Sequence, residues 1–474
     1  MTTHTTASPP VKDVPSTVPA HERHGVSSRE AFWVWVRIAA LSFGGPAGQI
    51  AVMHRILVEE KRWISETRFL HALNYCTLVP GPEAHKLAVY IGWLLHRTRG
   101  GLTAGLLFIF PGLISLGVLS WIFATYGNVG YVQALFFGLQ AAVLAVVLEA
   151  VIRVGRRALK THLMVLMAAL SFIAIFFFAV PFPAIIICAA LIGLIGNATG
   201  KISARSAGHG SAESDDGPLP AIDAAFAVEV PEHVRPSHSR ALKVTLIGGL
   251  LWLSPLIILM ATMGPGNVFA NIAAFFSKLS VLTFGGAYAI LTYVAQQAVD
   301  HYHWLAPGEM LSGLGMAETT PGPLISVVQF VGFMAAFRHP GTLDPALAGT
   351  LGGFLAKWVT FAPSFLFIFI GAPYIEALRN NRALNTVLSM IMAAVVGVIL
   401  NLAIWFAIHT LFAQVDVRHM FGMTLQIPVF SSLNPWALML SSAAVIALFR
   451  FKLSMIITLA GCCIAGIVIH MLSA

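Results

Sequence analysis

The sequence contains little charge. Of its 474 residues, 28 are Lys or Arg and 20 are Asp or Glu, which together make 10%, whereas 57% are apolar. Soluble globular proteins are typically about 25% charged, so this chain could not cover a water-facing surface of ordinary composition. The composition therefore excludes an ordinary soluble protein and predicts an integral membrane protein.

The sequence also lacks the alternating pattern of a membrane β-barrel, whose strands alternate polar and apolar residues over about ten residues. Its apolar runs are long and unbroken, so we expect an all-α polytopic membrane protein. The runs long enough to span or half-span a membrane are 31–53, 100–126, 131–152, 162–180, 182–198, 241–262, 268–297, 347–373, 386–411, 432–449 and 453–472. The shorter runs, at 66–78, 83–96, 309–320 and 323–338, are too brief to cross easily.

Motifs for redox, metal or nucleotide chemistry are missing as well. The four cysteines, Cys76, Cys188, Cys462 and Cys463, form no Cys-x-x-Cys motif. The run from Gly196 to Lys201 lacks the first Gly and the final Ser or Thr of a phosphate-binding loop, and His-Glu-x-x-His does not occur. We therefore expect no enzyme activity, no cofactor and no metal.

The few charges are unevenly placed. Residues 1–30 hold six of them and residues 199–240 hold ten. We therefore expect a disordered tail at 1–30, a first half at 31–198, a flexible linker at 199–240 and a second half at 241–474. The remaining basic residues form short clusters beside apolar runs, where they set membrane topology, so the net charge of +8 does not indicate nucleic-acid binding.

An internal repeat links the two halves. At an offset of 241 residues, Leu41, Phe43, Gly44, Gly45 and Trp63 recur as Leu282, Phe284, Gly285, Gly286 and Trp304, and Pro80-Gly81-Pro82 recurs as Pro321-Gly322-Pro323. After an insertion the offset becomes 252, where Thr98, Gly100, Gly101 and Pro111 match Thr350, Gly352, Gly353 and Pro363. Repeats with broken helices at corresponding places are typical of secondary transporters, whose substrate site lies at the repeat interface.

Charged loops indicate how the halves are oriented. The loop with Arg55, Lys61 and Arg62 corresponds to a loop without Lys or Arg, whereas the basic loop at 374–385 corresponds to the uncharged loop at 126–131. The positive-inside rule therefore places equivalent loops on opposite sides, and we favour inverted repeats. Three apolar segments lie between Lys160 and the second repeat, so an inverted arrangement requires one of them not to cross.

The repeated Gly-Gly segments interrupt apolar runs and predict helix breaks. A half-helix that begins there would expose backbone N–H groups, which attract anions, beside a hydroxyl in each half. The alternative is close helix packing through small residues. The candidate substrate-binding residues of these segments are Ser42, Gly44, Gly45, Thr283, Gly285 and Gly286.

The Pro-Gly-Pro segments predict either a helical hairpin that turns back within the membrane or one broken helix. Their glycines, Gly81 and Gly322, are further candidate substrate-binding residues. Ionisable residues flank them asymmetrically. Glu83 and Lys86 follow the first copy, and Glu318 precedes the second. Charges inside a membrane usually face a cavity or a partner. We expect Glu83 and Glu318 to couple protons and Lys86 to bind an anion, or else Glu83 and Lys86 to pair as neighbours on a helix.

Lys357 lies ten residues into an apolar run and is a further candidate anion ligand. Arg37 and Lys278, near the ends of their runs, are explained by snorkelling to the headgroups.

These motifs resemble the chromate ion transporter family, in its long two-domain form. The resemblance rests on Leu-Ser-Phe-Gly-Gly-Pro from Leu41, on the run from Pro80 to Gly92, and on the second copies of Phe-Gly-Gly and Pro-Gly-Pro. It covers about 31–160 and 268–411. It implies chromate efflux through the bacterial inner membrane, driven by the proton motive force, with chromate resistance as the outcome and homologous halves inserted oppositely.

Several alternatives stay open at this point. Sulfate has the same tetrahedral shape and charge as chromate, so sulfate or another oxyanion is a second candidate substrate, moved by import or exchange. A third hypothesis is a membrane-embedded chromate-reducing oxidoreductase. The missing cofactor motifs argue against it. We expect chromate, protons and the lipid bilayer as partners, allow for a homodimer, and expect no nucleic acid.

Overall fold

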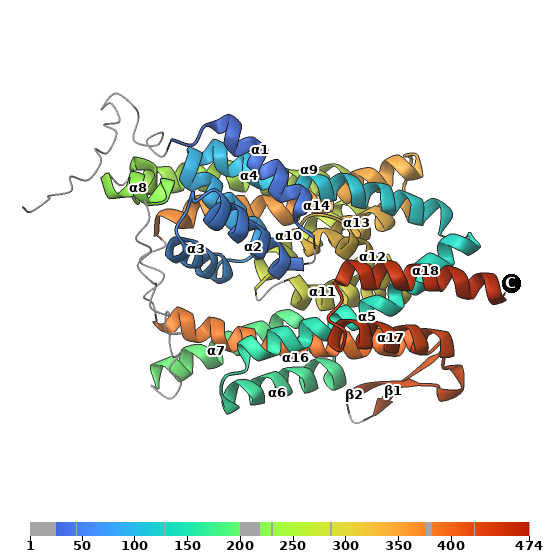
Figure 1. The fold of residues 1–474 in the computed structure, drawn as a ribbon. Coiled ribbons are helices and arrows are strands. Elements are labelled where there is room, and N and C mark those ends of the chain that lie inside the picture. Colours follow the sequence, from blue (N-terminus) through green and yellow to red (C-terminus); the bar gives the residue numbers. More distant parts are fainter. Residues whose placement is uncertain are drawn as a thin grey trace, which may run out of the picture.

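The computed structural model of the protein describes residues 25–43, 45–127, 129–199, 219–228, 231–284, 287–374, 382–420 and 422–473. Nearly all of this part is helical (Figure 1), so the expectation of an all-α polytopic protein is confirmed. Residues 1–24 of the expected tail and 200–218 of the expected linker lie outside the described residues.

The first half of the chain contains seven of the described helices. They are α1 (Ser28–Leu41), α2 (Gly45–His54), α3 (Glu66–Leu78), α4 (Glu83–Tyr126), α5 (Gly130–Ala158), α6 (His162–Phe178) and α7 (Phe182–Ala198). A π-helical turn, Arg55–Glu60, extends α2. The backbone leaves helical geometry at His96 and Arg97, so α4 is a short helix followed by a long one, as the separate runs 83–96 and 100–126 predict.

The second half follows a short helix, α8 (Ala221–Val228). Its helices are α9 (His238–Met263), α10 (Val268–Leu282), α11 (Ala287–Gln296), α12 (Pro307–Thr319), α13 (Val327–Arg338), α14 (Pro345–Gly371), α16 (Arg382–Leu411), α17 (Pro435–Phe449) and α18 (Met455–Ser473). The described sheet is one antiparallel hairpin between α16 and α17, formed by β1 (Val415–Met420) and β2 (Met423–Pro428).

The run 31–53 is a helical hairpin and not a span. It is divided into α1 and α2 at the predicted break, where Ser42 ends α1. Lys61 after the hairpin pairs with Glu30 in the first turn of α1 at 2.8 Å, and Arg37 pairs with Glu60 at 2.7 Å. Both ends of the hairpin therefore lie at the same end of the molecule.

Each Pro-Gly-Pro segment is the tip of a second hairpin, which settles the choice between a hairpin and one broken helix. Around the first tip, the ring of Tyr75 on α3 lies 5.9 Å from the ring of Tyr90 on α4. Around the second tip, Gly313 on α12 lies against Phe330 on α13. Gly81 and Gly322 adopt φ values of +112° and +118°, a region that side chains rarely enter, so each turn requires glycine.

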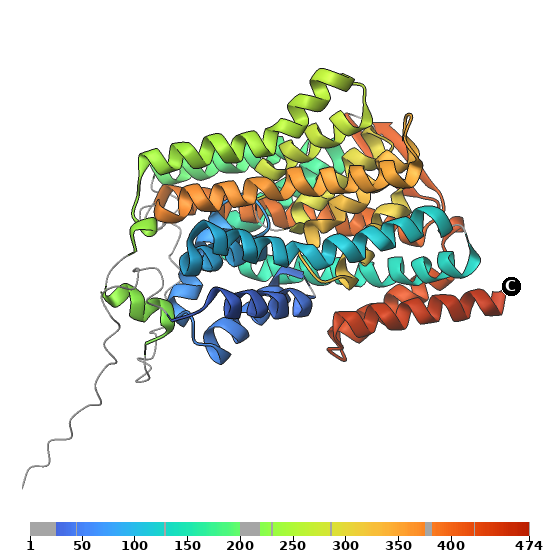
Figure 2. The same cartoon turned by 90° about the horizontal axis from the view of Figure 1, so that it is seen from above.

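The two halves are inverted relative to each other. The long part of α4 and its repeat equivalent α14 pack together but run in opposite directions (Figures 1 and 2). The equivalents α5 and α16 also run in opposite directions. In each half, two hairpins thus enter the molecule from the same side, and two long helices come after them in the chain.

The inverted arrangement does not require one of the segments between the halves to stop short of crossing. The segments α6, α7 and α9 all run along the long helices, α6 and α7 beside α16 and α9 beside α14. The segment that does not cross is 31–53, because the helix break at Ser42 returns the chain to the side from which it came. The first half then begins and ends on one side. Because α6 and α7 run back and forth along α16 and α9 is long enough to span, the second half begins on the opposite side.

Part of the expected flexible linker is an ordered helix. Asp223 on α8 accepts hydrogen bonds from the Ser65 N–H at 2.9 Å and from Arg68 Nε at 2.8 Å. The Arg68 guanidinium also lies 4.4 Å above the Phe226 ring. Residues 219–228 are therefore fixed against the loop that precedes α3, at the end of the molecule where the first half begins.

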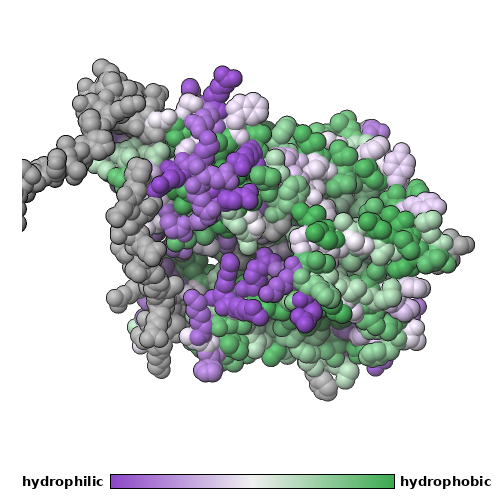
Figure 3. Space-filling model, in the orientation of Figure 1, coloured by the Kyte–Doolittle hydropathy of each residue, from purple (hydrophilic) through white to green (hydrophobic). Residues whose placement is uncertain are grey.

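Hydrophilic side chains gather toward one end of the molecule, and apolar side chains cover the rest of the face in view (Figure 3). Six described helices are long and apolar enough to cross a membrane: Glu83–Tyr126, Gly130–Ala158, His238–Met263, Pro345–Tyr374, Ala383–Leu411 and Met455–Leu472. The basic cluster of Arg153, Arg156, Arg157 and Lys160 lies at and just after the C-terminal end of α5. By the positive-inside rule, we expect that end of the molecule to be cytoplasmic.

The inverted arrangement predicts which residues share a side of the membrane. In a variant whose four cysteines are replaced by alanine, we expect Lys61→Cys and Thr161→Cys to react with a membrane-impermeant thiol reagent only from the cytoplasmic side. Thr342→Cys, in the loop between α13 and α14, should react only from the opposite side. Labelling of Lys61→Cys and Thr161→Cys from opposite sides would contradict the hairpin assigned to the first Pro-Gly-Pro segment, because only α3, α4 and α5 lie between the two positions.

Candidate substrate site

The tip of each Pro-Gly-Pro hairpin meets the helix break of the other half. The Gly81 N–H donates a hydrogen bond to the Thr283 carbonyl at 2.8 Å, and the Gly322 N–H donates one to the Ser42 carbonyl at 2.8 Å. These two bonds are equivalent under the repeat, because Gly81 corresponds to Gly322 and Ser42 to Thr283. They place the predicted elements of both halves at one point in the interior.

Each tip is also enclosed by the long helix of the other half. A side chain at Gly112 on α4 would meet the Pro321 carbonyl, 2.6 Å from the position of a Cβ atom, and a Cβ at Gly81 would lie 2.6 Å from Ser364 Oγ on α14. Gly112 and Ser364 are repeat equivalents. Gln49 on α2 adds a hydrogen bond from its amide to the Gly322 carbonyl at 2.6 Å.

The hydroxyl groups at the two helix breaks are buried and bonded within their own helices. Ser42 donates to the Ile38 carbonyl at 2.6 Å and Thr283 to the Leu279 carbonyl at 2.8 Å. In this conformation their protons are engaged, as are the N–H groups of Gly81 and Gly322. An oxyanion that used these donors would have to replace an internal acceptor.

Of the glycines predicted at the helix breaks, Gly44, Gly285 and Gly286 lie outside the described residues. Gly45 begins α2 at a φ of +73°. The helices α2, α4, α11 and α13 all begin at or just after these breaks and tips, so four helix N-termini converge on the interior. Helix N-termini carry partial positive charge and favour anions.

One buried lysine lies at each tip. Lys86 is 1% exposed and donates a hydrogen bond to the Val79 carbonyl at the first tip. Lys357 is 3% exposed, and its Nζ lies 3.7 Å from the position of a Cβ on Gly112, which contacts the second tip. The two lysines are not repeat equivalents. Each tip therefore has one lysine beside it, although the two lysines do not occupy equivalent positions of the repeat.

Neither lysine is neutralised by a carboxylate among the described residues. Lys357 Nζ donates to the Gln329 amide oxygen at 2.9 Å, and the amide nitrogen of Gln329 donates in turn to the Leu113 carbonyl at 2.8 Å. Lys86 Nζ donates to the Val79 carbonyl, and the structure shows no ion pair between Lys86 and Glu83, although both are described. Burying an unpaired charge is costly, so the two lysines remain candidate anion ligands.

The two candidate acids occupy different environments. Glu318 on α12 is 1% exposed and accepts a hydrogen bond from the Tyr288 hydroxyl at 2.5 Å. Its other oxygen has no hydrogen-bond partner and lies 3.9 Å from the position of a Cβ on Gly45. Glu83, the first residue of α4, is only partly buried. The structure therefore brings Glu318 to the helix break of the opposite half.

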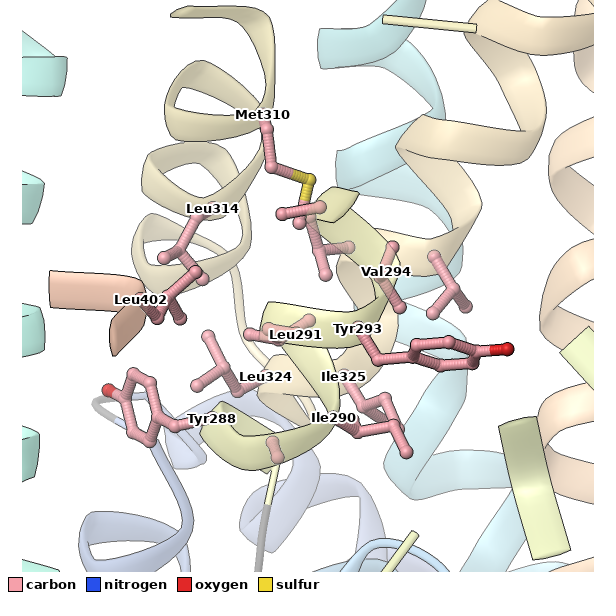
Figure 4. Close-up of a cluster of buried hydrophobic side chains, with 14 of the residues drawn as sticks. Tyr288, Ile290, Leu291, Tyr293, Val294, Met310, Leu314, Leu324, Ile325 and Leu402 are labelled. Carbon is pink, nitrogen blue, oxygen red and sulfur yellow. The ribbon is translucent and has the colours of Figure 1, made fainter. Parts of the chain in front are cut away.

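Apolar packing holds the Glu318 region in place. Leu291 on α11, Leu314 on α12 and Leu402 on α16 converge in a buried cluster, and the ring of Tyr288 lies at its edge with the hydroxyl directed away (Figure 4). The Glu318–Tyr288 hydrogen bond thus lies at the boundary between this cluster and the two half-helix ends.

Sequence reasoning missed four residues of this site: Gln49, Gln329, Tyr288 and Ser364. The two glutamines carry a signal that could have found them, because each is an uncharged polar residue inside an apolar run. Tyr288 and Ser364 carry no such signal, since both residue types are common in membrane helices and only the fold brings them to Glu318 and Gly81.

Comparison with known proteins identifies the family and recovers the two halves of the repeat. A family model described as Chromate transporter matches the chain twice, over residues 29–194 and 270–467, which are the two halves of the repeat. A chromate transport protein of Pseudomonas aeruginosa is 32% identical over 384 residues, which cover 79% of this chain and 80% of that protein. One of Cupriavidus metallidurans is 25% identical over 392 residues, 83% of this chain and 86% of that protein.

A probable chromate transport protein of Synechococcus elongatus is 26% identical over 391 residues, which cover 82% of this chain and 86% of that protein. No solved structure matches the chain. The family model covers most of the chain, and the relatives extend over both halves. This chain therefore belongs to the chromate transporter family.

Proposed function

We propose that this protein exports chromate across the bacterial inner membrane, driven by the proton motive force, and so confers chromate resistance. The family supports chromate as the substrate. The observation that carries the proposal furthest is the pair of buried lysines, Lys86 and Lys357, one at each hairpin tip.

Charge balance fits the substrate to this site. Chromate and sulfate are tetrahedral dianions, and the two lysines supply two positive charges without carboxylate partners among the described residues. A bound dianion would neutralise both, replacing the Val79 carbonyl and the Gln329 amide as their acceptors. The converging helix N-termini, with Ser42, Thr283, Gly81 and Gly322, would surround the remaining oxygens.

The membrane potential favours the outward direction. Each elementary charge that crosses 100 mV is worth about 2.3 kcal/mol, so a negative cell interior favours expulsion of a dianion by about 4.6 kcal/mol. Uptake of the same ion would need more than two co-transported cations to be electrically downhill. Export is thus the direction that needs the least coupling.

Glu318 is the proposed proton carrier, with Glu83 as the second candidate. The Glu318 carboxyl is buried, bonded to Tyr288, and has one unpartnered oxygen beside Gly45. A buried carboxylate beside a helix break changes its charge when it takes up a proton, which couples protonation to the arrangement of the tips. We propose that the halves 31–198 and 241–474 shift around this contact to open the site to either side.

Everted membrane vesicles test the proposed function directly. When respiration makes the vesicle lumen positive and acidic, vesicles that contain the protein should accumulate chromate, and a protonophore should abolish the accumulation. Sulfate added outside should compete if one site accepts both ions. Equal chromate content in vesicles with and without the protein would contradict export.

Removing either buried lysine should weaken substrate binding. For Lys86→Gln and Lys357→Gln we expect the apparent KM for chromate to rise about 10- to 100-fold, the usual size of a lost hydrogen bond to a charged group. Arginine at either position should restore part of the loss. Lys278→Gln is the matched control, because Lys278 is an exposed lysine on α10. A KM shift in the control equal to that in the other variants would argue against the site.

Glu318→Gln should remove proton coupling and leave electrical driving intact. With the membrane potential fixed by a potassium diffusion gradient, an acidic lumen should stimulate chromate uptake by the unmodified protein but not by Glu318→Gln. Tyr288→Phe keeps the carboxyl and should keep the stimulation. Glu309→Gln, an acid on the same helix that pairs with Arg338 at the surface, serves as the control. Full stimulation of Glu318→Gln would assign proton coupling to another residue.

A further inference from the structure

A cavity of about 410 Å³ lies between α2, α5 and the turn that joins α17 to α18. The residues that line it are Ala47, Glu149, Arg153, Leu448, Lys452, Leu453 and Met455. Ala47 is two residues after Gly45, so one wall of the cavity belongs to α2, the half-helix that begins at the candidate site. The cavity therefore lies between the cytoplasmic end of α5 and the helix break.

The charged side chains of the cavity are two cations and one acid. Arg153 Nη2 pairs with Glu149 Oε1 at 2.7 Å, one helical turn apart on α5, and both side chains are about one-third exposed, at 28% and 35%. Lys452, on the opposite wall, adopts a φ of +52°, a conformation that non-glycine residues rarely adopt. The turn thus holds Lys452 at the cavity although its backbone disfavours that geometry, and the cavity keeps a net positive charge.

The charges on α5 also extend toward the candidate site. Arg157 lies one turn after Arg153 on the same face of α5, so Glu149, Arg153 and Arg157 form a charged row near the end of this helix. The helix α5 packs against α12, which carries Glu318.

We propose that this cavity is the cytoplasmic vestibule of the transporter, where Arg153 and Lys452 capture a tetrahedral dianion before it reaches the hairpin tips. This inference rests on the proposed function. The guanidinium of Arg153 matches two oxygens of such an anion, as it matches a carboxylate. Arg153 exchanges Glu149 for the anion on arrival and returns to Glu149 when the anion moves inward, so Glu149 keeps the capture reversible.

Kinetics provide the first test. In everted vesicles, Arg153→Gln and Lys452→Gln should raise the KM for chromate about tenfold with little change in the maximal rate, because charges in a cleft concentrate a counter-ion by at least this factor. The same variants should reduce the dependence of the uptake rate on ionic strength, and Arg153→Lys should recover part of it. Arg156→Gln, an exposed arginine on the same helix, is the matched control.

Anion occupancy provides a second test that needs no transport. In the variant without native cysteines, Leu453→Cys places a thiol in the cavity wall, and molybdate serves as a dianion that does not oxidise thiols as chromate does. Molybdate added from the cytoplasmic side should slow the reaction of this thiol with a thiol reagent. The protection should be lost when Arg153→Gln is added and kept when Arg156→Gln is added.

The two tests separate the vestibule from the proposed function. If vesicles take up no chromate but molybdate protects Leu453→Cys through Arg153, the proposed function fails and the anion site stands. If vesicles transport chromate but Arg153→Gln and Lys452→Gln behave like Arg156→Gln and molybdate gives no protection, the vestibule is overturned and export stands. If vesicles take up no chromate and molybdate gives no protection, both proposals are contradicted.

Discussion

The two hydrogen bonds that join each Pro-Gly-Pro tip to the helix break of the other half are the contact on which the rest of the structure depends. They run from Gly81 to Thr283 and from Gly322 to Ser42, and they exist only because the halves are inverted and their hairpins enter from opposite sides. Backbone groups inside a membrane must find internal partners. Here each half supplies the partners of the other, so neither break could be stable alone.

The site around this contact is asymmetric in charge although its backbone is nearly symmetric. Both tips are glycine turns enclosed by a long helix, but Lys86 comes from the hairpin itself and Lys357 from α14. Glu318 approaches from the second half alone. The nearly symmetric backbone thus has one lysine at each tip and a single acid, Glu318, contributed by the second half. That combination can hold a dianion and respond to a proton without two identical sites.

Much of the fold could be predicted from the sequence, because apolar runs and glycine-proline breaks are local signals and the repeat shows which segments correspond. Whether 31–53 spans the membrane or forms a hairpin could not be predicted, because its length suits both. Only the end of α1 at Ser42 and the ion pairs of Glu30 and Glu60 distinguish the two. For the site, the sequence predicts the candidate residues that lie at the Gly-Gly and Pro-Gly-Pro breaks. The amides of Gln49 and Gln329 and the Tyr288 hydroxyl join it through tertiary contacts that no spacing reveals.

The central claim is that a tetrahedral dianion binds between the two tips, with Lys86 and Lys357 as its cations. The most direct measurement is a crystal structure of the protein with chromate, in which anomalous scattering from chromium locates the ion. The account predicts a peak within hydrogen-bond reach of both lysine Nζ atoms, with the Val79 carbonyl and the Gln329 amide released. A chromium peak away from both tips, with these two internal hydrogen bonds intact, would contradict it.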